Sequence, residues 1–314
     1  MLKRLFSFSC FRYLFAQVAL FFALSSACCA SGPCVDVVVF SYNRPMQLYA
    51  FLKSFYQYTE NYNEVHVIYR ADDASYSTAY DVVAAKFAKA QFHKQGQTPK
   101  QDFKPLVLSS AFSKTSTAEY VAFGVDDIII TDSVDLTECV KSLEAYQGWG
   151  FFLRLGKNIT ECCMLNIKTP PPQPITTTDS LLVWDFSQGR GDWNYPNSVD
   201  MTIYKKQKIR NFLETGDYSN PNTLENLWHR QKNSNSSTKG VCFLHSKIVN
   251  IPLNVVNFWS KMKKIHYTTE NLLKSFQEGM EIDISKFYKV NNPDAHMEYD
   301  VSFIQRATDP EFTN

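Results

Sequence analysis

Short apolar runs alternate with helical patterns from Cys34 onward, and this alternation limits the fold more than any other feature of the chain. The run from Val35 to Phe40 is largely β-branched, as expected of a strand that is buried on both faces. Ser41 to Pro45 interrupts this run, and apolar side chains then recur at helical spacing, at Leu48, Phe51, Leu52 and Phe55. A second unit of the same kind follows, with a strand at residues 65–69 and a helix at residues 80–87. Two successive strand-loop-helix units predict an α/β fold in which a mixed, mostly parallel sheet is flanked by helices.

The rest of the chain continues this alternation less regularly. We predict further strands at residues 106–108, 120–124 and 181–186, an apolar segment at 149–155 and a polar loop at 95–104. Helical patterns cover residues 198–213 and 270–277, and a short helix begins near Asn220 and extends through Trp228. We therefore expect a single domain over residues 34–314, with a helical tail from about residue 261.

Polar side chains follow three of the predicted strands at the points where those strands end. In chain order they are Asn43, Arg44, Asp72, Asp73, Asp126 and Asp127. Ligands of open α/β sheets bind in the crevice beyond the carboxyl ends of the strands. We therefore predict a ligand site at this edge of the sheet, while an acidic turn after a strand is the competing interpretation of Asp126 and Asp127.

Several of these segments carry a family resemblance. Val39-Phe40-Ser41-Tyr42-Asn43-Arg44-Pro45 resembles the first strand and loop of family 2 glycosyltransferases with the GT-A fold, and Asp72-Asp73-Ala74-Ser75 resembles their Asp-Asp-Gly-Ser motif. Val125-Asp126-Asp127 resembles their Asp-x-Asp metal motif, with Val125 in the place of the first Asp. Residues 193–200, 220–225 and 246–252 are similar to stretches of poorly characterised bacterial and viral glycosyltransferase-like proteins. The resemblance implies the GT-A fold, a Rossmann-like nucleotide-diphospho-sugar transferase fold.

The resemblance also implies an activity and a donor site. The implied reaction moves a sugar from a nucleotide-diphosphate donor to a glycan, lipid or protein acceptor. The leaving diphosphate develops charge, which a divalent cation, Mn2+ or Mg2+, neutralises when carboxylates hold it. The expected metal ligands are Asp127, Asp126 and His245. The expected nucleotide-sugar-binding residues are Asn43, Arg44, Asp72, Asp73 and Asp126.

The acceptor side of the reaction needs a base that removes the proton of the acceptor hydroxyl. Asp200, at a predicted helix start, is the candidate base and Asp192 is the alternative, although helix capping also explains an Asp at such a position. Trp193 and Tyr195 are candidates for stacking on an acceptor sugar, and core packing is the competing interpretation of both rings.

The first 30 residues have the composition of a targeting segment. Lys3, Arg4 and Arg12 precede an uncharged apolar run from Tyr13 to Ala27. The run is shorter than the roughly 20 apolar residues that a membrane-spanning helix needs. This favours a signal peptide cleaved near residues 27–30, with an uncleaved N-terminal membrane anchor as the alternative. In either case we expect the rest of the chain to be translocated across a membrane, and thus secreted, periplasmic, lumenal or anchored to the membrane by the N-terminal segment.

Composition and the absence of two motifs argue against several classes of function. The formal net charge of +1 over 314 residues gives no basic field for a polyanion, so we expect no nucleic-acid partner. The sequence contains neither a Gly-x-x-x-x-Gly-Lys phosphate loop nor a Gly-x-Ser-x-Gly elbow. Five Cys follow residue 30, an odd number that allows one or two disulfides without implying them. The alternative to a transferase is a non-catalytic glycan-binding or surface protein that retains the fold.

Overall fold

The computed structural model describes residues 34–254 and 267–307. The chain divides into two compact units, Met1–Gly32 and Pro33–Asn314, and the described residues all belong to the second. The predicted targeting segment at 1–30 and the predicted start of the tail near residue 261 lie outside the described residues. Within the described ranges, no helix is both long and apolar enough to cross a membrane.

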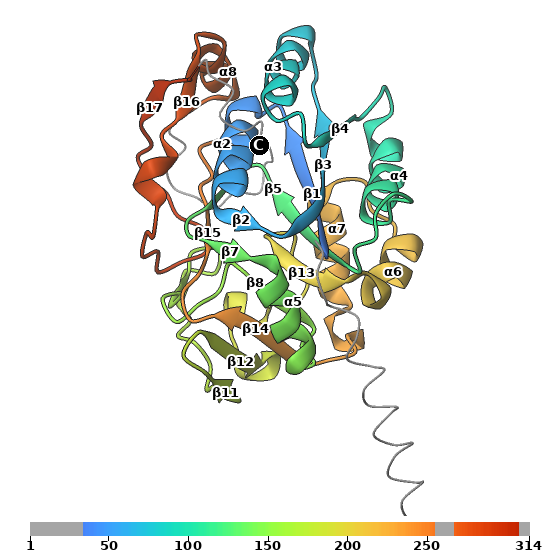
Figure 1. The fold of residues 1–314 in the computed structure, drawn as a ribbon, viewed down its shortest axis with the longest axis vertical. Coiled ribbons are helices and arrows are strands. Elements are labelled where there is room, and N and C mark those ends of the chain that lie inside the picture. The colour runs from blue at the N-terminus through green and yellow to red at the C-terminus, as the bar shows by residue number, and fades with distance from the viewer. Residues whose placement is uncertain (1–33, 255–266, 308–314) are drawn as a thin grey trace, which may run out of the picture. The chain divides into compact units, whose positions relative to one another are not determined.

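A nine-stranded sheet forms the centre of the second unit (Figure 1), in the order β11-β12-β14-β8-β13-β5-β1-β3-β4. Its strands are β1 (Val35–Tyr42), β3 (Tyr62–Arg70), β4 (Gln91–Lys94), β5 (Tyr120–Val125), β8 (Gly150–Phe152), β11 (Thr176–Thr177), β12 (Leu181–Asp185), β13 (Thr202–Lys205) and β14 (Lys239–Phe243). The four strands β4, β3, β1 and β5 are parallel, whereas β13 runs antiparallel to both of its neighbours, β5 and β8. The predicted mixed, mostly parallel sheet is therefore confirmed.

Helices cover both faces of this sheet. They are α2 (Pro45–Tyr58), α3 (Ala74–Lys86), α4 (Pro99–Ala111), α5 (Leu136–Ala145), α6 (Lys206–Thr215), α7 (Pro221–Arg230) and α8 (Thr269–Gln277). In Figure 1, α2, α3 and α8 lie together on one side of β1, and α4 and α6 lie together on the other. Four two-stranded sheets complete the fold: β2 (Thr59–Glu60) with β7 (Val134–Asp135), β6 (Ile128–Ile130) with β15 (Ile248–Asn250), β9 (Glu161–Cys162) with β10 (Ile167–Lys168), and β16 (Met280–Ile282) with β17 (Phe303–Gln305).

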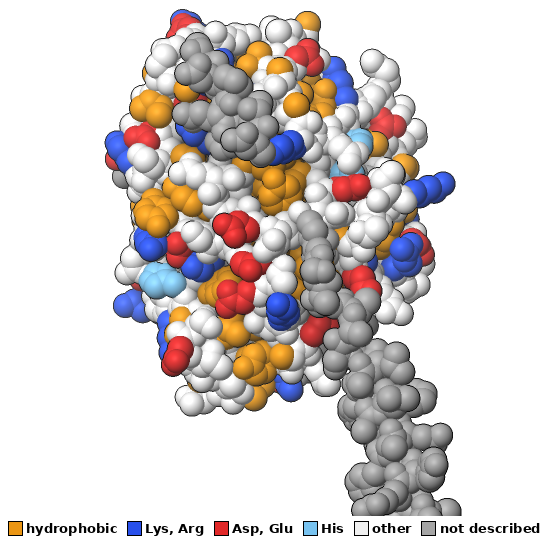
Figure 2. Space-filling view, viewed as in Figure 1, with side chains coloured by type: hydrophobic (Ala, Val, Ile, Leu, Met, Phe, Trp, Pro, Cys, Tyr) orange, Lys and Arg blue, Asp and Glu red, His pale blue; other side chains and the backbone are white. Residues whose placement is uncertain are grey.

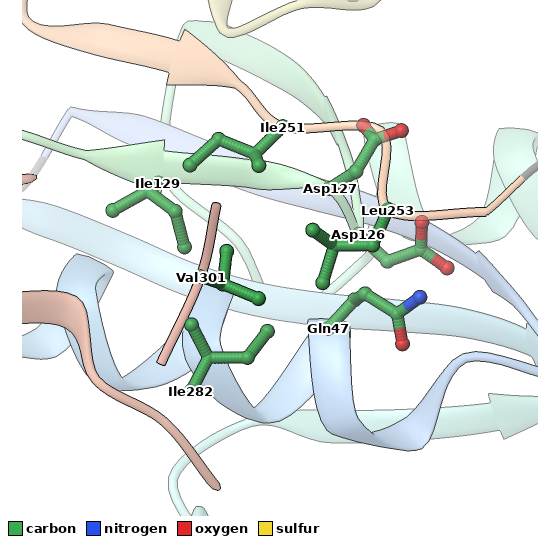
Figure 3. Close-up of a pocket in the computed structure, with 8 residues that line it drawn as sticks. All are labelled: Gln47, Asp126, Asp127, Ile129, Ile251, Leu253, Ile282 and Val301. Atoms are coloured by element: carbon green, nitrogen blue, oxygen red, sulfur yellow. The ribbon is translucent and has the colours of Figure 1, made fainter. Parts of the chain in front are cut away.

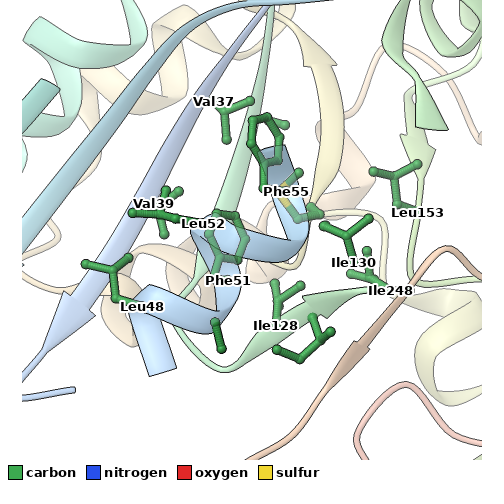
Figure 4. Close-up of a cluster of buried hydrophobic side chains, with 14 of the residues drawn as sticks. Val37, Val39, Leu48, Phe51, Leu52, Phe55, Ile128, Ile130, Leu153 and Ile248 are labelled. Atoms are coloured by element: carbon green, nitrogen blue, oxygen red, sulfur yellow. The ribbon is translucent and has the colours of Figure 1, made fainter. Parts of the chain in front are cut away.

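The side chains of β1 alternate between two hydrophobic cores, one on each face of the sheet. Val37 and Val39 join the core formed with α2, which Figure 4 shows packed around Phe51 and Phe55. Val38 joins the second core, which α4, α6 and α7 cover. Because both faces are covered, the β-branched run that opens the domain is buried along its whole length, as its composition predicts.

Three predicted elements have a different secondary structure in whole or in part. Helix α4 covers residues 99–104 of the predicted loop at 95–104 and all of the predicted strand at 106–108. Pro99 lies in its first turn, where a missing N–H costs nothing, and Phe103, Val107 and Ala111 form its buried stripe. The predicted helix at 198–213 begins only at Lys206, because residues 202–205 form β13 at the centre of the sheet. Tertiary pairing with β5 and β8 therefore overrides the local helical pattern.

The predicted helical tail is a mixed element in the part that the structure describes. Helix α8 is followed by the β16–β17 hairpin, and Gly279 ends the helix with a φ of +85°. The tail packs on α2, where Tyr49 meets Phe276 and Lys53 forms an ion pair with Glu281 at 2.6 Å. These residues are therefore part of the domain and not an appendage.

Among the described residues, the charges on one face (Figure 2) are mixed in sign and the cysteines form no disulfide. Basic and acidic side chains are interspersed on the face that Figure 2 shows, so neither sign dominates it. The five described cysteines, Cys34, Cys139, Cys162, Cys163 and Cys242, are all free thiols.

Candidate functional site

The polar residues that follow β1, β3 and β5 meet at one edge of the sheet. The three strands are parallel, and their ends are in register, with Tyr42 beside Arg70 and Phe40 beside Val125. The segments that leave these strands therefore emerge side by side, as the sequence predicts.

Arg44 links β1 to the acidic pair. Its Nη1 lies 3.1 Å from Oδ1 of Asp126 and 3.3 Å from Oδ2 of Asp127, and its Nη2 donates to the backbone carbonyl of Asn254 at 2.5 Å. The three side chains expose 11%, 4% and 15% of their surface, so the charges are largely removed from water. The carboxylates raise the pKa of Arg44 more than its burial lowers it, which keeps the guanidinium charged.

The Asp126 carboxylate is fixed from several directions. Its Oδ2 accepts hydrogen bonds from Ser41 Oγ at 2.8 Å and from the Tyr42 backbone N–H at 3.3 Å. Burial raises the pKa of Asp126 to about 6, and the nearby charge of Asp127 adds to this effect, while Arg44 opposes it. Both oxygens of Asp126 already have partners, so this residue is better placed to fix the loop than to bind a ligand.

Asp127 has an unused ligand atom. Its Oδ1 is buried and has no hydrogen-bond partner, although Oδ2 contacts Arg44. The pair borders a small recess whose remaining walls are largely apolar. Figure 3 shows the carboxylates and the Gln47 amide at one side of this recess, opposite Ile129 and Val301. A buried oxygen of this kind is satisfied when a cation or a hydrogen-bond donor enters the site.

Asn43 and Asp72 form the second part of the site. Asn43 has a φ of +51°, a conformation that Asn tolerates, and its amide group both donates to Oδ2 and accepts from the N–H of Asp72, each at 3.1 Å. Tyr42 and Arg70 also donate to the Asp72 carboxylate. Burial alone would raise the pKa of Asp72, but these partners lower it, and the side chain is 40% exposed. Asp72 therefore presents a charged acceptor to solvent.

A second polar cluster forms around Asp200, just before β13. Asn250 Nδ2 donates to Oδ1 of Asp200 at 3.1 Å, and His296 Nε2 lies 3.7 Å from Oδ2. Burial lowers the pKa of His296, but the charges of Asp200, Asp192 and Asp127 outweigh it and raise the value. The Ile251 N–H donates to the Asp127 carbonyl at 2.7 Å, and the preceding residue, Asn250, contacts Asp200, so residues 250–251 connect the two clusters.

Asp192 belongs to the same cluster but is held differently. Its carboxylate accepts a hydrogen bond from the buried Arg154, which also donates to the Tyr195 carbonyl at 3.0 Å. Burial would raise the pKa of Asp192, and the charges of Arg154 and His296 lower it instead. A carboxylate that is held by a buried guanidinium is a weak proton acceptor.

Comparison with known proteins gives one significant sequence relative. Bifunctional glycosyltransferase pgtA of Dictyostelium discoideum is 29% identical over 196 residues, covering 57% of this chain and 25% of the relative. The chain thus spans about a quarter of that protein's length. No family model matches the chain. Part of this chain is thus similar in sequence to a glycosyltransferase.

Solved structures overlap with this chain over only part of the fold. S. aureus TarS in complex with UDP has a TM-score of 0.38 at 15% identity, covering 57% of this chain and 48% of the other. A mannosyltransferase from Pyrobaculum calidifontis, in complex with GDP-Man and Mn2+, gives 0.37 at 12% identity, with coverages of 65% and 58%. The 4-diphosphocytidyl-2C-methyl-D-erythritol synthase of Anaerococcus prevotii gives 0.39 at 11% identity, with coverages of 79% and 97%.

Four of the predicted site residues lie away from the positions that their predicted roles need. Trp193 is fully buried and donates to the Ile159 carbonyl, so its ring packs in the core and offers no face to an acceptor. Tyr195 is half-buried and stacks on His229 with ring centroids 4.0 Å apart. Asp73 caps α3 by accepting from the Tyr76 N–H, and His245 is exposed in the turn after β14.

The structure adds residues that the sequence did not indicate. Asn250 and His296 lie side by side because the Asn250 N–H donates to the Ala295 carbonyl and the Met297 N–H donates to the Asn250 carbonyl. Glu225, on α7, accepts from the Val199 N–H beside Asp200. These contacts join segments that are far apart in sequence, and His296 follows Pro293-Asp294-Ala295, a turn composition without a functional signature. Only knowledge of the pairing with β15 would have identified it.

Proposed function

We propose that this protein is a glycosyltransferase that moves a sugar from a nucleotide-diphosphate donor to the hydroxyl of an acceptor. The observation that carries the proposal is a pair of neighbouring clusters that residues 250–251 connect. Arg44, Asp126 and Asp127 form one, and Asp200 with His296 forms the other. The first cluster supplies a free carboxylate oxygen that can hold a cation for the diphosphate, and the second supplies a carboxylate for proton transfer. The sequence similarity to a glycosyltransferase supports the same conclusion.

We assign the nucleoside to the part of the site formed by Asn43 and Asp72. The exposed Asp72 carboxylate is a suitable acceptor for ribose hydroxyls or for N–H groups of a base, since Tyr42 and Asn43 hold it in one orientation. TarS binds UDP and the mannosyltransferase from Pyrobaculum calidifontis binds GDP-mannose, and we propose a nucleotide of this class for the present chain.

We assign a divalent cation, Mn2+ or Mg2+, to Asp127. Within residues 34–254 and 267–307, no three His, Cys, Asp or Glu side chains are arranged to hold a metal ion. The buried, unpartnered Oδ1 of Asp127 nevertheless fits a cation that takes its other ligands from water and from the donor phosphates, as Mg2+ commonly does. When bound, the ion would neutralise charge on the diphosphate. Asp126, whose oxygens are engaged, would keep Arg44 and the loop in place.

We assign the base to Asp200 and not to Asp192, because Arg154 holds Asp192 in an ion pair. Asp200 accepts the proton of the acceptor hydroxyl as the acceptor oxygen bonds to the anomeric carbon. The bond from that carbon to the diphosphate breaks, and the nucleotide diphosphate leaves with the electron pair. Asn250 fixes the orientation of the carboxylate during this step.

The acceptor site is expected beside Asp200, because the base must reach the acceptor hydroxyl. We propose a glycan, lipid or protein acceptor, and a location across a membrane or at its surface if the N-terminal segment acts as the targeting signal that its composition predicts.

Release of nucleotide diphosphate tests the proposal. The wild-type protein is incubated with a panel of UDP- and GDP-sugars, Mn2+ and simple sugar acceptors, and free UDP and GDP are measured. We expect release from at least one donor, its loss in Asp200→Asn, and normal release in Asp179→Asn, which alters an exposed turn between β11 and β12. No release from any donor, combined with binding to glycans, would favour the non-catalytic glycan-binding alternative.

A further inference from the structure

The turn that carries Asp200, residues 197–201, is tied to helix α7 at two points. Asn197 Nδ2 donates to the Trp228 carbonyl at 2.8 Å, and the Val199 N–H donates to Glu225 Oε1 at 3.0 Å. Within the turn, the Asp200 N–H donates to Ser198 Oγ at 3.0 Å. The backbone on either side of Asp200 is therefore set by contacts with another element.

The turn also contains an unfavourable backbone conformation. Met201, directly after Asp200, has a φ of +48° and is fully buried. A non-glycine residue in this region costs on the order of 1 kcal/mol or more, and the conformation persists only where surrounding contacts enforce it. The Met201 N–H donates to the Phe123 carbonyl at 2.7 Å, which fixes one side of the turn. The contacts with α7 fix the other.

Helix α7 is a rigid support for these contacts. Asn220 and Thr223 form a reciprocal capping box at its start, and Leu224 and Trp228 are buried in the core beneath it. Trp228 also stacks on Phe212 of α6, with ring centroids 5.3 Å apart. A side chain on such an element has a well-defined position, which is what a group that orients another residue requires.

We infer that Glu225 is a positioning residue for Asp200, and that it acts by accepting the Val199 N–H and so holding the turn at 197–201 in its bent conformation. The inference rests on the proposed function, because it gives Asp200 the role of the base. Glu225 itself need not touch the acceptor or the donor.

The ionisation of Glu225 is consistent with a role that depends on the length of its side chain more than on its charge. Burial raises its pKa to about 7, and the negative charge of Asp200 adds to the rise, while the Val199 N–H, Arg154 and Ser198 oppose it. The carboxyl group is thus partly protonated near neutral pH. Its carbonyl oxygen accepts the Val199 N–H in either state.

Two conservative variants distinguish the effect of the length of the Glu225 side chain from the effect of its charge. Glu225→Gln keeps the length and the acceptor oxygen but removes the charge. Glu225→Asp keeps the charge but is one methylene shorter, so it withdraws the acceptor from Val199. Asn226→Ala is the matched control, because Asn226 is the next residue on α7 and is exposed.

Hydrogen exchange at residues 197–201 and steady-state kinetics are measured for the full chain. We expect Glu225→Asp to speed exchange in this segment at least tenfold, and to lower kcat by about tenfold or more with little change in the donor KM, since small misplacements of a reacting group are costly. Glu225→Gln and Asn226→Ala should resemble the wild type in both measurements.

The two readouts keep the inference separate from the proposed function. Unchanged exchange in Glu225→Asp, or faster exchange with an unchanged kcat, would overturn the positioning role. The positioning role would also be overturned if Glu225→Gln changed hydrogen exchange and kcat as much as Glu225→Asp does. The charge of Glu225, and not the length of its side chain, would then matter. A wild-type protein without turnover would refute the transferase proposal, and exchange alone would then decide whether Glu225 holds the turn.

Discussion

Replacing Asp126 with Asn should remove a pH dependence of stability that the wild-type protein has between about pH 4 and pH 7. Asp126 is 3% exposed, and burial together with the charge of Asp127 raises its pKa from 3.8 to about 6. The folded state therefore binds this proton more tightly than the unfolded state does. The resulting stabilisation is fully present below the ordinary pKa and is lost as the pH rises through about 6.

The magnitude follows from the shift in proton affinity. Each tenfold change is worth about 1.4 kcal/mol, so a rise of the pKa from 3.8 to about 6 corresponds to roughly 3 kcal/mol. Replacement by Asn also changes the bonds with Ser41 and Arg44, which adds an offset to the difference in the free energy of unfolding. That offset does not vary with pH over this range, because the Asn side chain does not titrate.

Urea unfolding of both proteins at several pH values between 4 and 7.5 measures the effect. We expect the free energy of unfolding of the wild type, minus that of Asp126→Asn, to fall by about 3 kcal/mol across this range. The same difference for Asp179→Asn, an exposed control, should change far less. A wild-type minus Asp126→Asn difference that stays constant with pH would refute the argument that burial outweighs the Arg44 ion pair.

Three further substitutions test other parts of the account. Trp193→Ala should lower the free energy of unfolding by about 3–5 kcal/mol in urea, because the ring is fully buried, and a loss below about 1 kcal/mol would contradict its place in the core. Asn220→Ala removes the capping box of α7 and should cost about 1 kcal/mol by the same measurement, whereas an unchanged midpoint would show that the cap is dispensable. Asp72→Asn should weaken nucleotide binding about tenfold in calorimetry without changing stability by much, since a bond to a charged group contributes about 1.5 kcal/mol or more. Unaltered affinity would remove Asp72 from the site.

The first half of the fold could be predicted from sequence because its signals are local. A β-branched run, a Pro in the first helical turn and a regular apolar stripe define β1 and α2 without reference to any other segment. The convergence of Arg44, Asp126 and Asp127 follows from parallel pairing, which the repeated strand-loop-helix units already indicate. The ion pair between them is not readable from the sequence, because it depends on side-chain directions.

The second half could not be predicted to the same extent, because its structure depends on distant partners. Residues 202–205 follow a helical pattern but become a strand when they pair between β5 and β8. Asp200 consequently lies in a turn before a strand and not at a helix start, so the capping argument weighed for it does not apply. His296 reaches Asp200 only because its segment pairs with β15.

Calorimetric titration with UDP and GDP, with and without Mn2+, tests most directly whether the Arg44, Asp126 and Asp127 cluster is a nucleotide-diphosphate site. The wild type and Asp179→Asn should bind at least one nucleotide more tightly when Mn2+ is present. Asp127→Asn should lose this metal-dependent part, because Oδ1 of Asp127 is the buried oxygen left without a partner. Equal binding by the wild type and Asp127→Asn, or no binding of either nucleotide by the wild type, would contradict the account.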